Sequence, residues 1–277
     1  MTAPFSVLLP VYAGDEADHL ARALESIAAQ TLPPDELVLV EDGPVGEATR
    51  AVVDGFVAAS AFPVRNVRLP ENVGLARALN EGLAVCSHEI VARHDADDVS
   101  VPERFARQIP AVEAGLDLLG SGLYEWELGA DGRESVVGKR VPPLGDADIR
   151  RAIPFRQPFN HPTVVYRKSA VLAVGGYEPV GTMEDYLLFA RMVLAGARTA
   201  NLPELLVGYR VSSGAYHRRG GVRMLRTELR LQREFRAAGL TTRTQFLRNV
   251  LVRGGYRLIP VWARRPLYRQ VFTDRPE

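Results

Sequence analysis

The chain of 277 residues contains a single cysteine, Cys86. One thiol excludes an internal disulfide framework and any metal site built from several cysteines, and it fits the reducing cytoplasm. The sequence also lacks a run of roughly 18 apolar residues, the length that a membrane-spanning helix needs. Its first apolar segment, residues 6–12, is too short for a secretory signal and has no basic start. These absences predict a cytoplasmic protein that is soluble or peripheral to a membrane.

Three functional signatures are missing as well. No G-x-G-x-x-G follows the first predicted strand, and G-x-x-x-x-G-K-[ST] does not occur, so dinucleotide-binding and P-loop interpretations lose their main support. No serine or cysteine stands in the setting of a nucleophile elbow.

An acidic turn is the most informative feature that is present. Residues 90–92 are apolar and predict the end of a buried strand, after which Asp95, Asp97 and Asp98 follow. Like charges this close raise one another's pKa unless a cation is bound, and hard divalent metals bind carboxylate oxygens. Ligands of open α/β sheets bind past the carboxyl ends of the strands. The alternative is a solvated turn in which Asp98 or Ser100 caps the following helix.

Apolar runs alternate with helical patterns through the first hundred residues. Strands are predicted at 5–11, 36–40, 64–69 and 89–92, and helices at 15–30, 47–59 and 75–85. This alternation implies βαβ units and a mainly parallel sheet, and continuously apolar strands imply that helices cover both faces. The predicted fold class is α/β, with an open, mainly parallel sheet flanked by helices. The ends of the first two strands should share one edge with the acidic turn.

The pattern changes after residue 101. The sequence then predicts a helix (102–113), a hairpin (116–126 and 135–141), a loop with one short helix (142–162), a strand (163–166), a helix (183–194) and two tail helices (222–237 and 244–253). Prolines at 260 and 266 interrupt the helical pattern beyond residue 253.

Two further features have open interpretations. Glu184 and Asp185 open a predicted helix, where acidic residues are favoured by the dipole, so one interpretation is capping. The other is that Asp185 projects into a cleft as a general base. His161 is either a hydrogen-bonded structural residue or a metal ligand.

The segment from residue 218 is strongly basic. It contains fifteen arginines, no lysine and four acidic residues, a net charge of +11, and because the whole chain carries +1, the remainder carries −10. Apolar residues recur among the arginines at helical spacing, namely Leu247, Val250, Leu251, Tyr256, Leu258, Ile259, Val261 and Trp262. This interleaving favours an anionic membrane surface over nucleic acid as the partner of residues 218–277. The alternative is a helix packed on the core with its arginines in solvent.

The ordered combination of motifs resembles family 2 glycosyltransferases of the GT-A fold. The matching pieces are Ser6-Val-Leu-Leu-Pro-Val-Tyr12, Val40-Glu-Asp-Gly43, Asn72-Val-Gly74, Asn80-Glu-Gly82, Arg93-His-Asp-Ala-Asp-Asp98 and Glu184-Asp185. Val40-Glu-Asp-Gly-Pro44, Leu79-Asn-Glu-Gly-Leu83 and Phe159-Asn-His-Pro-Thr163 are similar, more narrowly, to the bacterial exopolysaccharide enzymes typified by amylovoran biosynthesis. The resemblance covers residues 4–215. It implies a glycosyltransferase domain at 1–217, with a Rossmann-like nucleotide-sugar half (1–100) and an acceptor half (101–217), followed by a basic helical tail (218–277).

The resemblance implies a role for each matching position. Tyr12 and Asp42 would hold the nucleotide base, Asp95 would contact ribose or metal, and Asp97 would bind Mn²⁺ or Mg²⁺. His161 is a further candidate ligand, and Asp185 would be the base that deprotonates the acceptor hydroxyl. Further donor-binding positions are expected at Pro10, Asn72, Gly74, Arg77 and Arg93, and at Arg218 and Arg219 beside a glycine hinge. Asn72 is also the predicted cap of the helix at 75–85.

The implied activity is the inverting transfer of one sugar from a nucleotide-diphosphate sugar, expected to be a UDP-sugar, to a polysaccharide or lipid-linked acceptor. Such an acceptor would lie at the inner face of the plasma membrane. The Gln-x-x-Arg-Trp of processive members is missing, so the enzyme is expected to be non-processive. Two alternatives remain: a sugar nucleotidyltransferase, which would need a glycine-rich basic loop after the first strand, and a catalytically silent nucleotide-sugar-binding or membrane-docking protein.

Overall fold

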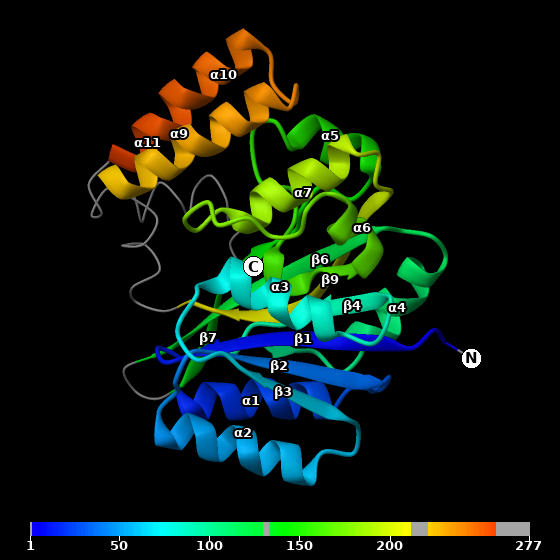
Figure 1. The fold of residues 1–277 in the computed structure, drawn as a ribbon. Helices are drawn as coiled ribbons and strands as arrows, with labels where there is room; N and C mark the ends of the chain where they lie inside the picture. Colours follow the sequence, from blue (N-terminus) through cyan, green and yellow to red (C-terminus); the bar gives the residue numbers. More distant parts are fainter. Residues whose placement is uncertain (1, 130–132, 212–220, 259–277) are drawn as a thin grey trace.

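The computed structural model describes residues 2–129, 133–211 and 221–258. The first part consists of β1 (Phe5–Tyr12), α1 (Ala17–Ala28), β2 (Glu36–Asp42), α2 (Glu47–Ala59), β3 (Val64–Arg68), α3 (Leu75–Val85) and β4 (Ile90–Arg93). Its strands are parallel and lie in the order β3-β2-β1-β4 (Figure 1). The predicted βαβ units of this half are therefore confirmed.

The second part continues the sheet with mixed strand directions. It consists of β5 (Val99–Ser100), α4 (Arg104–Glu113), β6 (Leu118–Leu128), β7 (Glu134–Arg140), α5 (Asp146–Ala152), a 3₁₀ turn η1 (His161–Thr163), β8 (Val165–Arg167), α6 (Lys168–Ala173), α7 (Glu184–Leu194) and β9 (Thr199–Arg210). β8 runs antiparallel to β4 and β6, β7 is antiparallel to β6, and β9 is parallel to β6. The described residues form one sheet of nine strands. The sheet is thus parallel in its first half and mixed in its second.

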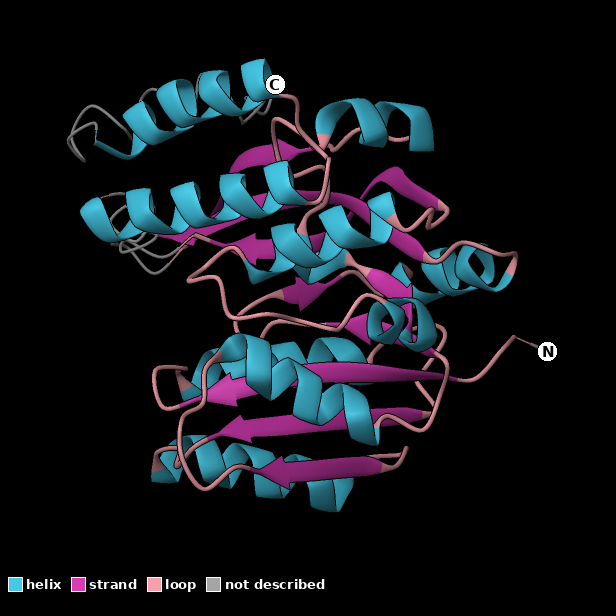
Figure 2. Cartoon of the chain, turned by 45° about the horizontal axis from the view of Figure 1, so that its top comes forward, coloured by secondary structure: helices cyan, strands magenta, loops and turns pink. Residues whose placement is uncertain are grey.

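Side chains of β1 alternate between two separate cores, one on each face of the sheet. Its odd-numbered apolar residues pack with α1 and α4, whereas Leu8 packs with α3 and α7. α1 buries Leu20, Leu24 and Ile27, which share one helix face. Burying each side chain of this size contributes about 1.5–3 kcal/mol. Coverage of both faces explains why β1 has apolar residues on both of its sides. Figure 2 shows the sheet between its helices.

Three elements of the second part are not predicted by the sequence. β5, α6 and β9 have no predicted counterpart, whereas the predicted hairpin corresponds to β6 and β7, and the predicted short helix to α5. β9 contains Pro203 and Glu204 and pairs with β6 through irregular register. These interruptions remove the simple alternation by which a strand is recognised.

The tail consists of α9 (Val222–Ala237), α10 (Arg243–Asn249), a π-helical turn η2 (Val250–Gly254) and α11 (Gly255–Leu258). α9 has the predicted bounds, and its Met224, Leu231 and Phe235 are buried in the core that contains α3 and α7. Figure 1 shows the tail helices together, beside α5 and α7 and at the end of the molecule farthest from α1 and α2. Within the three described segments, no helix combines the length and apolar character that crossing a bilayer requires.

Candidate active site

Three parallel strands end together at one edge of the sheet. β1 and β2 pair in register up to Tyr12 and Asp42, so their last residues lie side by side. β4 pairs with the other side of β1 and leads directly into residues 94–98. The predicted convergence of three strand ends is confirmed, and it places the acidic turn at the carboxyl edge, where sheets of this class bind ligands.

The carboxylates of the acidic turn have cationic and backbone partners. Asp95 forms an ion pair with the buried guanidinium of Arg93. Asp97 Oδ2 lies 3.2 Å from Nη2 of Arg210 on β9. Asp98 Oδ1 accepts a hydrogen bond of 3.0 Å from the backbone N–H of Arg210. The other oxygen of Asp98, Oδ2, is buried and has no hydrogen-bond partner among the described residues.

The capping alternative for Asp98 and Ser100 is wrong. α4 begins at Arg104, and its N-cap position, Glu103, makes no side-chain capping bond. Ser100 Oγ instead accepts a hydrogen bond of 3.0 Å from Nη1 of Arg104. The turn carboxylates therefore do not serve the helix that comes after them.

Negative charge is concentrated at this edge. Burial raises the pKa of Asp97 and of Asp98, and the charge of Asp95 raises both further. Asp15, in the loop after β1, belongs to the same group. Burial raises its pKa to about 7, against the hydrogen bond from the Tyr12 N–H, and the charges of Asp97 and Asp95 add to the shift. Asp15 is absent from the residues predicted by the sequence, because a single aspartate in a loop carries no motif.

Asp95 and Asp97 fit a divalent cation by the chemistry of their oxygen donors. The unpartnered buried oxygen of Asp98 is consistent with a missing positive charge. In the described part of the chain, no three His, Cys, Asp or Glu side chains are arranged as ligands of one metal. A cation would therefore be held by two carboxylates together with phosphate oxygens of a ligand, which is a common arrangement for Mg²⁺. Arg210 would have to release Asp97.

Asp42 fixes the start of α3. Its carboxylate accepts hydrogen bonds from the backbone N–H of Val73 at 2.7 Å and of Gly74 at 3.0 Å. Gly74 is the N-cap of α3 and has a φ of 86°, a left-handed conformation that favours glycine. The prediction that Asn72 caps this helix is wrong, because Asn72 Nδ2 donates to the carbonyl of Asp42 instead. A carboxylate offers about four acceptor positions, so Asp42 keeps capacity for a ligand N–H.

The remaining predicted donor positions differ in exposure. Tyr12 and Arg77 are exposed, and Tyr12 ends β1 at the same edge as the acidic turn. Pro10 is buried within β1, opposite Val40 of β2. The predictions for residues 218 and 219 fall outside the described residues.

A second pair of carboxylates opens α7. Burial raises the pKa of both Glu184 and Asp185, and the charge of Asp185 adds to the shift of Glu184. Asn80 of α3 fixes the preceding turn, because its amide donates to the carbonyl of Tyr177 and accepts from the Tyr177 N–H, at 2.8 and 2.9 Å. A carboxylate with a raised pKa is the stronger proton acceptor. The start of α7 therefore places two carboxylates of raised pKa where the helix dipole favours negative charge.

His161 lies beside Asp185. Its Nδ1 is 4.0 Å from Asp185 Oδ2, and its Nε2 is 3.1 Å from the hydroxyl of Tyr177. Burial, together with the charge of Arg93, lowers the pKa of His161 well below its usual range, so the ring is neutral at neutral pH. These contacts support the hydrogen-bonded interpretation, and the contacts of His161 in the described residues do not connect it with the acidic turn.

Arg93 links the two carboxylate groups. It pairs with Asp95, and its charge acts on the pKa of Asp97 and also on those of Glu184 and Asp185. Its Nε and Nη1 are buried without a partner in the described structure. A buried unpaired donor costs about 1–3 kcal/mol, a cost that a bound anion would remove. The site therefore combines the carboxylates of the acidic turn, guanidinium donors that have no partner among the described residues and a second pair of carboxylates at the start of α7.

Sequence comparisons find relatives along nearly the whole chain. The family model described as glycosyl transferase family 2 matches residues 6–173. The amylovoran biosynthesis glycosyltransferase AmsE of Erwinia amylovora is 38% identical over 269 residues, which cover 96% of this chain and 98% of that protein. The UDP-Gal:alpha-D-GlcNAc-diphosphoundecaprenol beta-1,3-galactosyltransferase of Escherichia coli is 32% identical over 272 residues, which cover 98% of this chain and 97% of that protein.

Solved structures share the fold. S. aureus TarS 1-349 in complex with UDP-GlcNAc has a TM-score of 0.66 at 19% identity, over 90% of this chain and 72% of that one. The mannosyltransferase PcManGT from Pyrobaculum calidifontis, in complex with GDP-Man and Mn2+, has a TM-score of 0.66 at 16% identity, over 98% of this chain and 76% of that one. The predicted GT-A fold is confirmed.

Proposed function

The chain belongs to glycosyltransferase family 2, and from this membership we propose that it transfers one sugar from a UDP-sugar to a lipid-linked or polysaccharide acceptor in exopolysaccharide or cell-envelope glycan synthesis. Transfer is non-processive, inverts the anomeric centre and depends on Mn²⁺ or Mg²⁺. One observation carries the proposal: Arg93 pairs with Asp95 in the acidic turn after β4, and its charge also acts on a separate carboxylate, Asp185, at the start of α7. A sugar nucleotidyltransferase is no longer supported, because the family places the chain elsewhere.

The choice of substrates rests on the relatives. The E. coli relative carries UDP-Gal and a diphosphoundecaprenol-linked GlcNAc in its name, and AmsE belongs by name to amylovoran biosynthesis. Both align over nearly the whole of this chain, including the tail. We extend from them the donor class, a UDP-sugar, and the acceptor class, a glycan on a lipid diphosphate.

On the donor side, the diphosphate would lie against Arg93 and the acidic turn. The two unpartnered guanidinium N–H groups of Arg93 can donate charge-assisted hydrogen bonds to phosphate oxygens. A divalent cation held by Asp97 and Asp95 would neutralise charge that develops on the leaving diphosphate. Asp42 and the exposed ring of Tyr12 stand at the neighbouring strand ends, where the nucleotide base would lie.

On the acceptor side, Asp185 accepts the proton of the attacking hydroxyl. The new bond forms between that oxygen and the anomeric carbon while the bond from this carbon to the diphosphate oxygen breaks. Attack from the face opposite the leaving group inverts the centre. The burial that raises the pKa of Asp185 makes it the better proton acceptor, and the neutral His161 is a second polar group beside it.

Calorimetric titration tests the donor site. Purified protein would be titrated with UDP, GDP and dTDP, each with and without Mn²⁺. We expect UDP to bind in a metal-dependent manner and the other two nucleotides to bind more weakly. Absence of binding by all three to folded protein would contradict the proposal and favour the silent docking protein instead.

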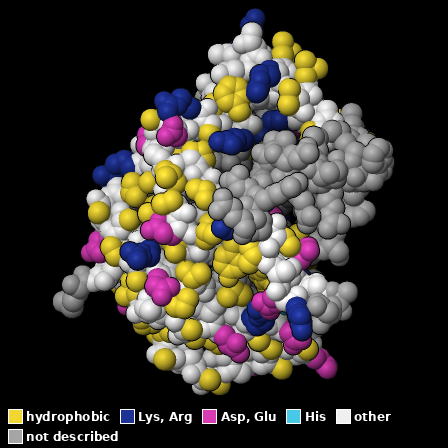
Figure 3. Space-filling model, turned by 180° about the vertical axis from the view of Figure 1, so that it is seen from behind, with side chains coloured by type: hydrophobic (Ala, Val, Ile, Leu, Met, Phe, Trp, Pro, Cys, Tyr) yellow, Lys and Arg dark blue, Asp and Glu magenta, His cyan; other side chains and the backbone are white. Residues whose placement is uncertain are grey.

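We also propose that the tail rests on an anionic membrane surface. In the consecutive elements α10, η2 and α11, the polar side chains of Asn249 and Arg253 face the rest of the molecule. Leu247, Leu251 and Val252 are exposed, at 59%, 75% and 59%. Exposed arginines lie along α9 at Arg223, Arg226, Arg230, Arg233 and Arg236. At the upper end of Figure 3, hydrophobic and basic side chains lie next to each other. Apolar insertion flanked by cations is the pattern of interfacial helices.

The residues that the sequence predicts to face a membrane differ in their exposure in the structure. Leu247 and Leu251 are exposed, whereas Val250 and Tyr256 are half-buried. Residues 259, 261 and 262 fall outside the described structure. α9 matches the alternative interpretation, a helix packed on the core, because it buries its apolar side and exposes its arginines.

Vesicle co-sedimentation tests the membrane proposal. The protein is expected to sediment with vesicles that contain phosphatidylglycerol and to remain in solution with pure phosphatidylcholine. Leu251→Asp should abolish sedimentation, whereas Leu128→Asp, at an exposed leucine of β6, should not. Equal sedimentation of both variants, or no sedimentation of the wild type, would contradict the proposal. Self-association through this face would appear as a dimer by light scattering.

A further inference from the structure

We infer that the inner side of the tail is part of the acceptor site. Arg253 and Asn249 act as positioning residues that fix residues 153–157, so that the side chain of Gln157 lies beside Asp185 and binds a hydroxyl of the acceptor sugar. The inference rests on the proposed role of Asp185 as the base. It adds a contact residue for the acceptor and gives the tail a role in catalysis.

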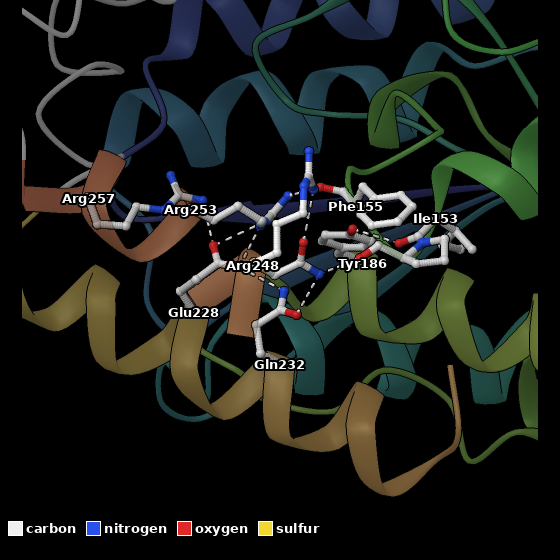
Figure 4. Close-up of polar contacts among 10 residues, drawn as sticks. Ile153, Phe155, Tyr186, Glu228, Gln232, Arg248, Arg253 and Arg257 are labelled. Atoms are coloured by element: carbon white, nitrogen blue, oxygen red, sulfur yellow. Dashed lines mark hydrogen bonds and ion pairs between the residues drawn. The ribbon is translucent and has the colours of Figure 1, made fainter. Parts of the chain in front are cut away.

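A buried carboxylate anchors the tail. Glu228 on α9 is fully buried. Its Oε1 accepts from Arg253 Nε at 2.6 Å and from Gln232 Nε2 at 3.0 Å, and its Oε2 accepts from Arg253 Nη2 at 3.2 Å and Arg257 Nη2 at 3.0 Å. Figure 4 shows Glu228 and Gln232 extending from α9 toward these groups. A bidentate arginine–carboxylate pair fixes the orientation of both side chains.

The network continues from the tail to the backbone of the acceptor half. Nη1 of Arg253 donates to the carbonyl of Phe155 at 2.8 Å. Nδ2 of Asn249 donates to the carbonyl of Pro154 at 2.7 Å and lies 3.0 Å from Oε1 of Gln232. Arg253 and Asn249 thus reach two consecutive carbonyls, while Glu228 and Gln232 hold them in place.

The same segment is tied to the start of α7. Tyr186, the residue after Asp185, donates its hydroxyl to the carbonyl of Ile153 at 2.7 Å (Figure 4). The guanidinium of Arg253 lies over the ring of Tyr186, 5.2 Å from its centroid. Three consecutive carbonyls are therefore fixed between the tail and the residue adjoining the base.

The segment ends at Gln157, whose amide is unsatisfied. Both Nε2 and Oε1 are buried, and neither makes a hydrogen bond of ordinary geometry within the described structure. Burial raises the pKa of Asp185, and Gln157 is nevertheless close enough to that carboxyl to reduce the rise. A sugar hydroxyl can accept from Nε2 and donate to Oε1 at once. An acceptor bound beside Asp185 would therefore satisfy the amide.

Packing alone does not require such a network. Replacing a buried ion pair with apolar side chains is often neutral or stabilising, and α9 already contributes Leu231 and Phe235 to the core. Hydrogen bonds to successive carbonyls, in contrast, fix the direction of the backbone. This control of direction is needed where a side chain must meet a substrate.

Steady-state kinetics of Gln157→Ala test the contact. The probes are UDP-galactose and a synthetic GlcNAc-diphosphate on a short lipid, the pair given by the name of the E. coli relative. We expect the acceptor KM to rise about tenfold, which corresponds to about 1.4 kcal/mol. The affinity for UDP should be unchanged. An unchanged acceptor KM would overturn the inference.

The role of the tail is tested by Arg253→Met, which should raise the acceptor KM as Gln157→Ala does. Arg253→Lys should give an acceptor KM between those of the wild type and Arg253→Met. Arg151→Met, which removes an exposed ion pair on α5, is the matched control. Because Arg253 acts through Gln157, the double variant should be no worse than Gln157→Ala alone. Additive effects, or a loss of kcat with KM unchanged, would contradict the positioning role. If Arg253→Met does not fold, Asn249→Ala replaces it, alone and combined with Gln157→Ala.

Asp185→Asn distinguishes a failure of the proposed function from a failure of the further inference. If this variant still transfers sugar, or if the wild type turns over no donor and acceptor pair, the proposed function fails. If Asp185→Asn is inactive and Gln157→Ala keeps the acceptor KM of the wild type, the further inference alone fails.

Discussion

The carboxyl edge of the sheet and the tail differ in how their buried charged groups are paired. At the carboxyl edge, Nε and Nη1 of Arg93 and one oxygen of Asp98 are buried without partners in the described residues. In the tail, the carboxylate of Glu228 accepts four hydrogen bonds, from Gln232, Arg253 and Arg257. Unsatisfied buried groups are costly and indicate a site that a ligand completes, whereas a satisfied network holds structure in place. Substitutions at the two regions should therefore differ in kind.

The largest effect on activity is expected from Asp185→Asn. The amide cannot accept the proton of the acceptor hydroxyl, so kcat for transfer should fall by about 10²–10⁴-fold. Thermal unfolding should change little, because an amide oxygen can still accept the hydrogen bond from the Tyr186 N–H at the start of α7. Transfer of radiolabelled sugar to acceptor measures the loss, and transfer at the wild-type rate would mean that the base lies elsewhere.

A somewhat smaller loss is expected from Asp97→Asn. Removal of one carboxylate from the predicted cation site should lower transfer by about 10²-fold and flatten its dependence on Mn²⁺ concentration. Asp148→Asn, at an exposed ion pair on α5, is the control of equal charge. A normal Mn²⁺ response in the Asp97 variant would remove the metal assignment.

Glu228→Gln should show the opposite profile, a loss of stability. It removes the fully buried charge that pairs with Arg253 and Arg257, whose side chains are mostly covered, and this costs about 3–5 kcal/mol in the free energy of unfolding. Glu178→Gln removes a partly exposed carboxylate that pairs with two arginines, and should cost about 0–1 kcal/mol. Urea unfolding compares the two variants, and equal costs would show that burial of the Glu228 network contributes nothing.

The stability contributed by Glu228 should depend on pH. Burial would raise the pKa of Glu228, but Arg253 and Arg257 outweigh burial and hold it below its ordinary value of 4.5. Because the folded pKa is the lower one, the stabilisation is complete above the ordinary pKa and is lost as the pH falls through the folded pKa. The difference in unfolding free energy between wild type and Glu228→Gln should therefore stay constant at higher pH and shrink below pH 4.5. A difference that grows on acidification would contradict the sign.

The smallest effect on stability is expected at Gly74, the glycine before α3. Gly74→Ala places a side chain at a φ of 86°, which costs about 1–2 kcal/mol, although the new Cβ would lie within 4 Å of no neighbouring atom. Gly46→Ala, at an equally open position with a φ of −64°, should be nearly neutral. Thermal unfolding of both variants checks this. Equal stability would mean that backbone conformation at Gly74 does not limit the donor half.

How far the sequence predicts the molecule depends on periodicity. The bounds of α9 are predictable because its apolar residues recur at helical spacing, and the strands β1, β2 and β4 because each contains a run of apolar residues. β9 is missed because proline and glutamate interrupt it. Glu228 and Arg253 are typical of a solvated helix face by sequence, yet they form an ion pair in which Glu228 is fully buried and Arg253 is mostly covered.

The site divides in the same way. Asp95, Asp97 and Asp185 can be proposed from the sequence because each belongs to a local motif at the start or end of an element. Asp15, Arg210 and Gln157 carry no such signal, since each reaches the site from a distant part of the chain through the fold. Tertiary structure supplies this part of the site, and spacing along the sequence does not contain it.

The central claim is that donor binding and proton abstraction belong to two separate carboxylate groups. Calorimetric titration of UDP with and without Mn²⁺, on wild type, Asp97→Asn and Asp185→Asn, tests it most directly. We expect Asp185→Asn to bind UDP with the metal dependence of the wild type, and Asp97→Asn to lose that dependence. Loss of metal-dependent UDP binding in Asp185→Asn, or its retention in Asp97→Asn, would contradict the claim.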